Sequence, residues 1–177
     1  MHIKKIIKGS IALAFTISLV SCSEDITLTP LAEDVPPTFA ASVDGSSFVD
    51  TLTVDAYTTE VDYDFNDEDN TIIEQGTYEA VRILASDEAS ASSMAIVFPT
   101  DAVEGTYEFS DTQGYYLANY LVAGADGVTE ANRATTGMLT LILHNQSSHY
   151  VEGYFAFETQ ENTITGGVFK TFYTVND

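Results

Sequence analysis

Hydrophobic and polar residues alternate with a period of two from Thr38 to the end of the chain, in short runs that end at turn residues. Such alternation predicts β-strands, because successive side chains of a strand point to opposite faces. The runs are 38–43, a resumption at Phe48, 51–57, 77–85, 93–98, 105–109, 115–123, 137–143, 150–159 and 168–175. Asp44-Gly45 tolerates positive φ and is expected to close a tight hairpin after the first run. With no convincing amphipathic helix, the pattern predicts an antiparallel all-β domain, a two-sheet β-sandwich first and a small β-barrel as the alternative.

The C-terminal runs show the pattern in most detail. Val151, Phe155 and Phe157 fall on one face of their run, and charged residues and tyrosines fall on the other. This division predicts one face in the core and one face in water. The last run differs, because Val168 and Phe172 share one face while apolar residues also occupy the other. We therefore expect a central strand that is buried on both faces.

A different pattern precedes the strands. Lys4, Lys5 and Lys8 are followed by an apolar run at 11–20, which is too short to span a bilayer and is typical of a secretory signal. The run ends in Leu19-Val20-Ser21-Cys22, which resembles the lipobox of bacterial lipoproteins. The resemblance implies cleavage before Cys22, lipidation of its sulfur and new amino terminus by palmitate-like acyl chains, and a membrane anchor. An incidental or buried thiol after an ordinary signal is the alternative.

The residues that follow Cys22 indicate sorting and a tether. Ser23-Glu24-Asp25 places no Asp next to the cysteine, which resembles outer-membrane sorting, and also resembles the surface-export signal of Bacteroidota lipoproteins. A solvated linker is the alternative interpretation. Pro30, Pro36 and Pro37 favour an extended tether, because proline restricts its own backbone and that of its neighbour. The expected divisions are a lipoprotein signal peptide at 1–21, a lipid-anchored tether at 22–37 and a single all-β domain at 38–177.

Landmarks along the predicted domain resemble one family of small proteins. They are Phe39-Ala40-Ala41-Ser42-Val43-Asp44-Gly45-Ser46-Ser47-Phe48, then Gly105-Thr106-Tyr107, Gly137-Met138-Leu139-Thr140-Leu141, Gly153-Tyr154-Phe155-Ala156-Phe157 and Gly167-Val168-Phe169. In this order they resemble the Bacteroidota lipoproteins grouped as domain of unknown function 6252. The resemblance implies a compact, lipid-anchored β domain of the cell envelope. That family has no assigned activity, so the resemblance assigns no catalytic residue here.

Charge excludes one class of partner. The chain has 27 acidic residues against 6 basic ones and a net charge of -21. Nucleic acid binding is excluded, because it needs a basic surface that displaces counterions from phosphate. Removal of the signal would take away three lysines and no acid, leaving Arg82, Arg133 and Lys170 as the basic residues. Cations are then the expected electrostatic companions of the domain, and with a single cysteine it forms no internal disulfide.

An acidic stretch at 60–70 suggests a cation site. Asp62, Asp64 and Asn66 match the first half of a calcium-binding loop, in which oxygen ligands occupy alternate positions. The second half departs from that pattern, because Asp67 stands where the loop needs Gly and Ile73 where it needs a bidentate Glu. A solvated acidic loop between two strands is the alternative.

Tyrosines suggest a second kind of site. The candidates for a face that stacks on sugar or another apolar ligand are Tyr115, Tyr116, Tyr120, Tyr150 and Tyr154. The alternative is that strands favour tyrosine and pair aromatic residues across the sheet without any ligand.

Catalytic residues are not indicated by any motif. His144 and His149 flank a predicted turn outside any nucleophile or metalloprotease pattern, and we expect both to be exposed. We therefore expect a non-enzymatic binding or structural protein of the outer membrane, on its periplasmic face or at the cell surface. The alternative is a carbohydrate- or small-ligand-binding module of an uptake system, and a hydrolase of extracellular polymers is a weaker third. The expected partners are the membrane, through Cys22, and a protein or glycan that the sequence does not identify.

Overall fold

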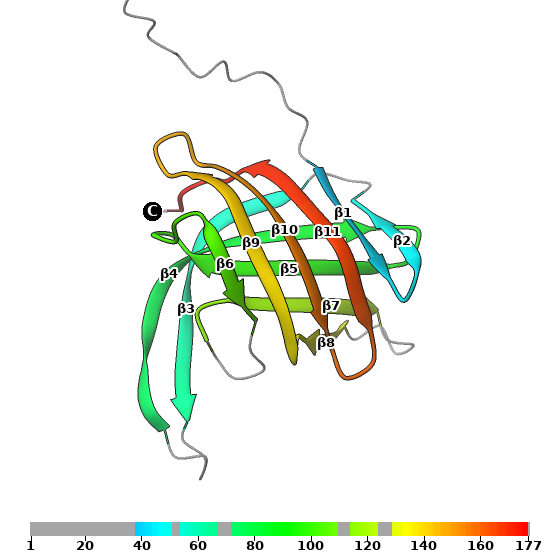
Figure 1. Cartoon of the computed structure of the whole chain (residues 1–177), viewed down its shortest axis with the longest axis horizontal. Helices are drawn as coiled ribbons and strands as arrows, with labels where there is room; N and C mark the ends of the chain where they lie inside the picture. The colour runs from blue at the N-terminus through cyan, green and yellow to red at the C-terminus, as the bar shows by residue number, and fades with distance from the viewer. Residues whose placement is uncertain (1–37, 51–53, 67–71, 110–113, 124–128, 177) are drawn as a thin grey trace, which may run out of the picture. The chain divides into compact units, whose positions relative to one another are not determined.

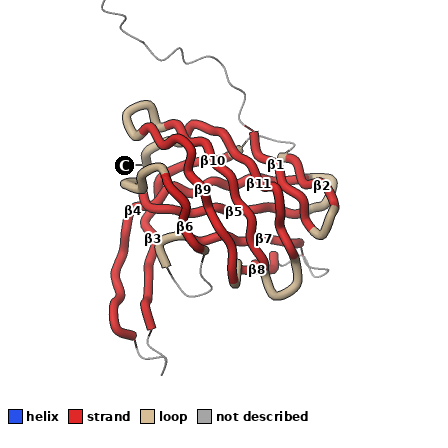
Figure 2. The backbone as a smooth tube through the Cα atoms, in the orientation of Figure 1, coloured by secondary structure: helices blue, strands red, loops and turns tan. Residues whose placement is uncertain are grey.

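Two antiparallel sheets, without a helix, make up the described part of the chain (Figures 1 and 2). The computed structural model describes residues 38–50, 54–66, 72–109, 114–123 and 129–176, except for the side chains of 64–66, 72 and 73. The strands are β1 Thr38–Val43, β2 Ser46–Val49, β3 Asp55–Asn66, β4 Ile72–Asp87, β5 Ser92–Pro99, β6 Gly105–Glu108, β7 Leu117–Ala123, β8 Thr129–Arg133, β9 Thr136–Asn145, β10 Tyr150–Glu158 and β11 Thr163–Phe172. The expected signal, Cys22 and tether lie outside the described residues and stay predictions.

The sheets face each other as a sandwich. Sheet A has the strand order β2-β1-β11-β10-β9-β6, and sheet B has the order β3-β4-β5-β7-β8. The strands of sheet A cross those of sheet B steeply (Figure 1). The predicted all-β sandwich is therefore confirmed. The alternative of a small barrel is wrong, because the two ladders do not close on each other.

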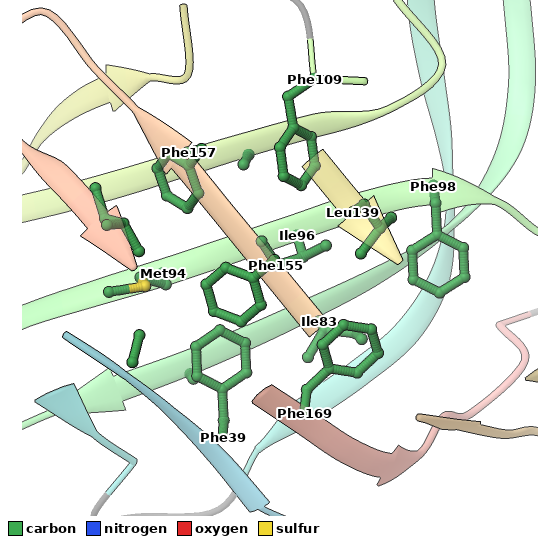
Figure 3. Packing of buried hydrophobic residues seen from close by; sticks show 14 of the residues in the cluster. Phe39, Ile83, Met94, Ile96, Phe98, Phe109, Leu139, Phe155, Phe157 and Phe169 are labelled. Atoms are coloured by element: carbon green, nitrogen blue, oxygen red, sulfur yellow. The ribbon is translucent and has the colours of Figure 1, made fainter. Parts of the chain in front are cut away.

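Phenylalanines fill the space between the sheets. Phe39, Phe155 and Phe169 of sheet A lie opposite Ile83 and Met94 of sheet B (Figure 3). The rings of Phe39 and Phe155 are 5.1 Å apart between centroids. Inward side chains come from alternate strand positions, as the alternation predicts. Their burial supplies the main stabilisation of a chain that has no internal disulfide.

The C-terminal end joins the two sheets at one corner. After β11, Thr174 forms an isolated parallel bridge with Tyr57 of β3. Its N–H donates to the Ala56 carbonyl at 2.9 Å, and its own carbonyl accepts from the N–H of Thr58 at 2.8 Å. Backbone hydrogen bonds thereby tie sheet A to the edge strand of sheet B.

The sequence predicted the positions of most strands correctly, but the burial of β11 incorrectly. β1 has the predicted bounds, whereas β8 was missed and β3 and β4 are longer than expected. β11 is central, between β1 and β10, but the prediction that both its faces are buried is wrong. Its outer face carries the exposed Phe172 and the partly exposed Lys170, because no third layer of described chain covers it.

Candidate functional site

A two-stranded ribbon projects from sheet B and carries the candidate site. Residues 60–66 of β3 pair with 72–79 of β4, while only residues 80–87 of β4 also pair with β5. The ribbon extends beyond the sandwich (Figure 1). Tyr78 is the register partner of Val61, and Gly76 is the partner of Tyr63. Because positions two apart share a face, Tyr63 and Tyr78 lie on the same face of the ribbon.

Three tyrosine rings meet at this face. Ring centroids are 6.2 Å apart for Tyr63 and Tyr78, 5.0 Å for Tyr63 and Tyr115, and 5.1 Å for Tyr78 and Tyr115. Tyr115 comes from the segment before β7, so the cluster connects the ribbon to the sandwich. We call these three residues the tyrosine cluster. Their separations are within the range of favourable aromatic contacts.

Hydrogen bonds hold two of the rings. The Tyr78 hydroxyl donates to the carbonyl of Tyr115 at 3.0 Å and, more weakly, to that of Gly114 at 3.4 Å. The Tyr63 hydroxyl donates to Oε1 of Glu74 at 3.1 Å. A Cβ at residue 76 would lie 3.0 Å from the Tyr63 ring, so Gly76 gives the ring room to lie across the ribbon.

The tyrosine cluster borders an open groove of about 460 Å³. The groove is lined by Tyr78, Glu79, Pro99, Thr100, Asp101 and Tyr115. A second groove of about 660 Å³ adjoins it through Glu79 and is lined by Thr58, Thr59, Glu60, Glu79 and Asn176. The Thr100 hydroxyl donates to the Glu79 carbonyl at 3.3 Å and lies 3.4 Å from its carboxylate Oε2. Ring faces therefore stand beside carboxylate and hydroxyl groups. We call the 460 Å³ groove the tyrosine groove.

The hydroxyls of Tyr63 and Tyr78 stay protonated well above neutral pH. Hydrogen bonding with Tyr115 and then with Glu74 raises the pKa of Tyr63 to about 12. Burial, followed by the neighbouring Tyr115, raises the pKa of Tyr78 to about 12, and the positive charge of Arg133 partly opposes this rise. At physiological pH both groups are neutral donors.

The five tyrosines predicted as one ligand face lie in separate places. Tyr115 is in the tyrosine cluster, and Tyr116 stacks on Tyr107 with centroids 4.1 Å apart. Tyr120 is buried in the core. Tyr150 and Tyr154 lie on sheet A, where Tyr150 contacts Phe172 and Tyr154 is 53% exposed. The predicted common face is therefore wrong.

Sequence reasoning missed Tyr63 and Tyr78. Tyr63 lies in the acidic stretch at 60–70, which was interpreted as a calcium site or a solvated loop, and Tyr78 lies in the predicted strand at 77–85 but was not among the candidate ligand residues. The tetrapeptide Gly-Thr-Tyr-Glu occurs twice, at 76–79 and at 105–108. Gly105 begins β6, but Gly76 lies inside β4. Tyrosines that alternate with acids on both sides of the acidic stretch were the available indication of a hairpin.

The calcium prediction falls on strand. Asp62, Asp64 and Asn66 belong to β3, so the expected loop is wrong at these positions. Alternate residues of a strand are about 7 Å apart, which separates oxygens that must approach calcium to about 2.4 Å. The side chains of Asp64 and Asn66 lie outside the described residues, and among those described no group of three His, Cys, Asp or Glu could hold a metal. Calcium binding stays a prediction.

The two histidines have different environments. His149 is exposed with φ 52° at the turn, as predicted. His144 is buried, which corrects the expectation of an exposed residue. Its Nδ1 lies 2.7 Å from the Ala102 carbonyl and must donate, so in the neutral ring Nε2 accepts from the Tyr173 hydroxyl at 3.1 Å. Both ring nitrogens are engaged in structural bonds.

Comparison with known proteins finds no matching family model, curated protein or solved structure. The resemblance to domain of unknown function 6252 therefore stays a prediction. Among the residues that the structure describes, no helix is long and apolar enough to cross a membrane.

Proposed function

We propose that the chain is a non-enzymatic binding protein, anchored to the outer membrane through Cys22, that binds a saccharide in the tyrosine groove. The observation that carries the proposal is the meeting of three tyrosine rings from β3, β4 and the segment before β7, two of which, Tyr78 and Tyr115, line a groove together with Glu79 and Asp101. Aromatic faces pack on the C–H groups of a sugar ring, while carboxylates and hydroxyls accept and donate hydrogen bonds to its hydroxyls.

The shape of the site also supports a saccharide. Both grooves are open to solvent and Glu79 lines both, so its carboxylate is accessible to a saccharide in either groove. The tyrosine cluster is positioned by backbone hydrogen bonds before any ligand arrives, which lowers the entropic cost of binding.

A second candidate is binding of a protein partner through the outer face of sheet A. Exposed apolar side chains on this sheet are Val49, Met138, Ile142, Leu143, Tyr154 and Phe172. A shallow groove of about 350 Å³ lies among Met138, Thr140, Tyr154, Phe155, Ala156, Gly166, Gly167 and Val168. Exposed apolar patches of this kind are typical of interaction surfaces.

The test is a titration of the chain from residue 22 onward with neutral oligosaccharides, followed by tyrosine fluorescence and NMR shifts. We expect saturable binding that falls about tenfold or more in Tyr115→Ala. Tyr154→Ala, an exposed tyrosine on the other sheet, is the matched control and should bind as the parent does. Equal binding by both variants, or no binding to any oligosaccharide, would refute the tyrosine groove.

Two further measurements address the rest of the proposal. Cys22→Ala should release the full chain from membranes, and its continued membrane association would refute the lipid anchor. Reducing ends are measured in the same saccharide titrations. Hydrolysis of the oligosaccharide that is lost in Glu79→Gln would show that the protein is a hydrolase and not a binding protein.

A further inference from the structure

Both arginines of the chain lie on the outer face of sheet B. Arg82 of β4 alternates with the fully buried Val81 and Ile83, so its side chain is on the face opposite the core. Arg133 of β8 pairs with Asn119 of β7, whose two neighbours along the strand are core residues. The two guanidinium groups therefore share one face of one sheet.

Among the residues that the structure describes, no acid pairs with either arginine. Within the part of the chain that the structure describes, Arg82 and Arg133 form no salt bridge, although the chain has 27 acidic residues. Lys170, the remaining basic residue of the domain, does pair with Glu152, at 3.6 Å on sheet A. In so acidic a chain, two unpaired arginines on one face form a local positive surface.

One donor on this face has no acceptor in the described part of the chain. Nε of Arg82 is buried and has no hydrogen-bond partner among the described residues. Buried donors are nearly always paired, because an unmet donor loses its hydrogen bond to water without replacement. An arginine presents Nε and a terminal nitrogen side by side, and this edge fits two oxygens of one oxyanion.

Buried apolar side chains lie beside Arg82 on the outer face of sheet B. Arg82, Val97 and Leu117 stand in one row across β4, β5 and β7. Val97 and Leu117 are only 6% and 5% exposed although they lie on the outer face, so neighbouring side chains cover them. Water screens the attraction between an arginine and an anion less beside buried apolar side chains than in open solvent.

The arginine face is continuous with the tyrosine groove. Tyr78 packs against the cluster that contains Val97 and Leu117. The charge of Arg133 also acts on the Tyr78 hydroxyl, whose pKa it lowers against the larger effect of burial. A ligand in the groove can therefore extend a substituent toward the arginines.

We propose that Arg82 and Arg133 bind an oxyanion, a carboxylate, sulfate or phosphate group, on the outer face of sheet B. The inference rests on the proposed function in one respect, that the oxyanion is an acidic substituent of the saccharide bound in the tyrosine groove. Free inorganic sulfate or phosphate is the other source. In either case the Nε edge of Arg82 donates to the oxyanion, and Arg133 adds the second positive charge.

The experiment observes the arginines directly. The chain has two arginines, so an NMR spectrum of the arginine Nε–Hε groups of the ¹⁵N-labelled chain from residue 22 contains two signals. Sodium sulfate, sodium phosphate and sodium glucuronate are titrated separately at millimolar concentrations, against sodium chloride at matched ionic strength. We expect a saturable downfield shift of the Arg82 signal with at least one oxyanion and no such shift with chloride. The absence of that shift with all three oxyanions would overturn the proposal.

Variants test which groups bind. Arg82→Lys keeps the charge but loses the Nε edge, and it should weaken oxyanion binding about tenfold or more, while Lys170→Gln should leave it unchanged. Equal affinity in Arg82→Lys and the parent would overturn the role of Nε. Because the titration of the parent already reads Arg82, a variant that fails to fold does not remove the test.

The source of the oxyanion is separated by comparing saccharides. Tighter binding of an acidic oligosaccharide than of its neutral counterpart, lost in Arg82→Lys, supports a saccharide substituent. Saturable binding of inorganic sulfate or phosphate without any saccharide binding would refute the tyrosine groove and keep the oxyanion site. Binding of neutral saccharides with no response to oxyanions would keep the groove and refute the arginine site.

Discussion

The ring of Phe169 occupies the space that a side chain at Gly153 would need. The two residues are register partners on β11 and β10, and a Cβ at 153 would lie 2.6 Å from Cζ of Phe169 and 2.5 Å from the Thr140 carbonyl oxygen. Phe155 lies over Gly167 in the same way, with a Cβ at 167 only 2.4 Å from its ring. Glycines in these strands therefore let the large core rings lie flat against the opposite strand.

Gly153→Ala should destabilise the fold. The added methyl group meets backbone as well as the Phe169 ring, and overpacking of this kind costs about 1–3 kcal/mol. The matched control is Gly105→Ala, since a Cβ at 105 would first meet the Tyr107 hydroxyl at 3.4 Å, an ordinary contact. Urea unfolding measures both variants. A similar loss in the two would mean that the close approach at Gly153 is relieved at little cost.

Local alternation predicted the strands because it reports which face of each strand is buried. Thr38–Val43 matches β1, and the inward set Val151, Phe155 and Phe157 is buried as expected. The ribbon was not predicted, since acids at 60–66 resemble solvated loop when only composition is considered. In a ribbon beyond the sandwich both faces can remain wet, so strand and acidity are compatible.

The tyrosine cluster could not be predicted for a different reason. Tyr63, Tyr78 and Tyr115 belong to three elements, and their meeting depends on the register between β3 and β4 and on the path of the chain before β7. Alternation fixes which face a residue takes but not which residue stands beside it on the next strand. The separation of the five predicted tyrosines has the same cause.

Tyr173→Phe should cost about 1–3 kcal/mol of unfolding free energy. The change removes the hydroxyl that donates to Nε2 of the buried His144 and leaves that nitrogen without its partner. Tyr154→Phe, at an exposed position, should change stability by less than about 0.5 kcal/mol. Denaturant unfolding measures both, and ¹⁵N shifts of the histidine ring should show the proton on Nδ1. Unchanged stability in Tyr173→Phe would show that the hydroxyl is dispensable to His144.

Stability should fall as the pH rises above 10. Tyr63 and Tyr78 have folded-state pKa values of about 12 against an ordinary value of 10.0, so the folded state keeps protons that the unfolded state releases. Their contribution is complete below pH 10 and is lost as the pH rises to about 12. Urea midpoints across this window measure the fall, and Tyr78→Phe should show a shallower one. An equally steep fall in that variant would place the effect on other tyrosines.

Arg82→Met should leave stability unchanged or raise it by up to about 1 kcal/mol, because it keeps a long apolar stem and removes a buried donor that has no acceptor among the described residues. Arg133→Met is the control, since no buried unpaired nitrogen is found on Arg133 in the described structure, and it should give no gain. Sulfate should raise the melting temperature of the parent and not that of Arg82→Met, because a ligand stabilises only the state that binds it. If Arg82 lowers the stability of the ligand-free protein and sulfate restores it, oxyanion binding explains why an arginine occupies this position. A large loss of stability in Arg82→Met, with sulfate stabilising both proteins equally, would instead assign Arg82 a purely structural role.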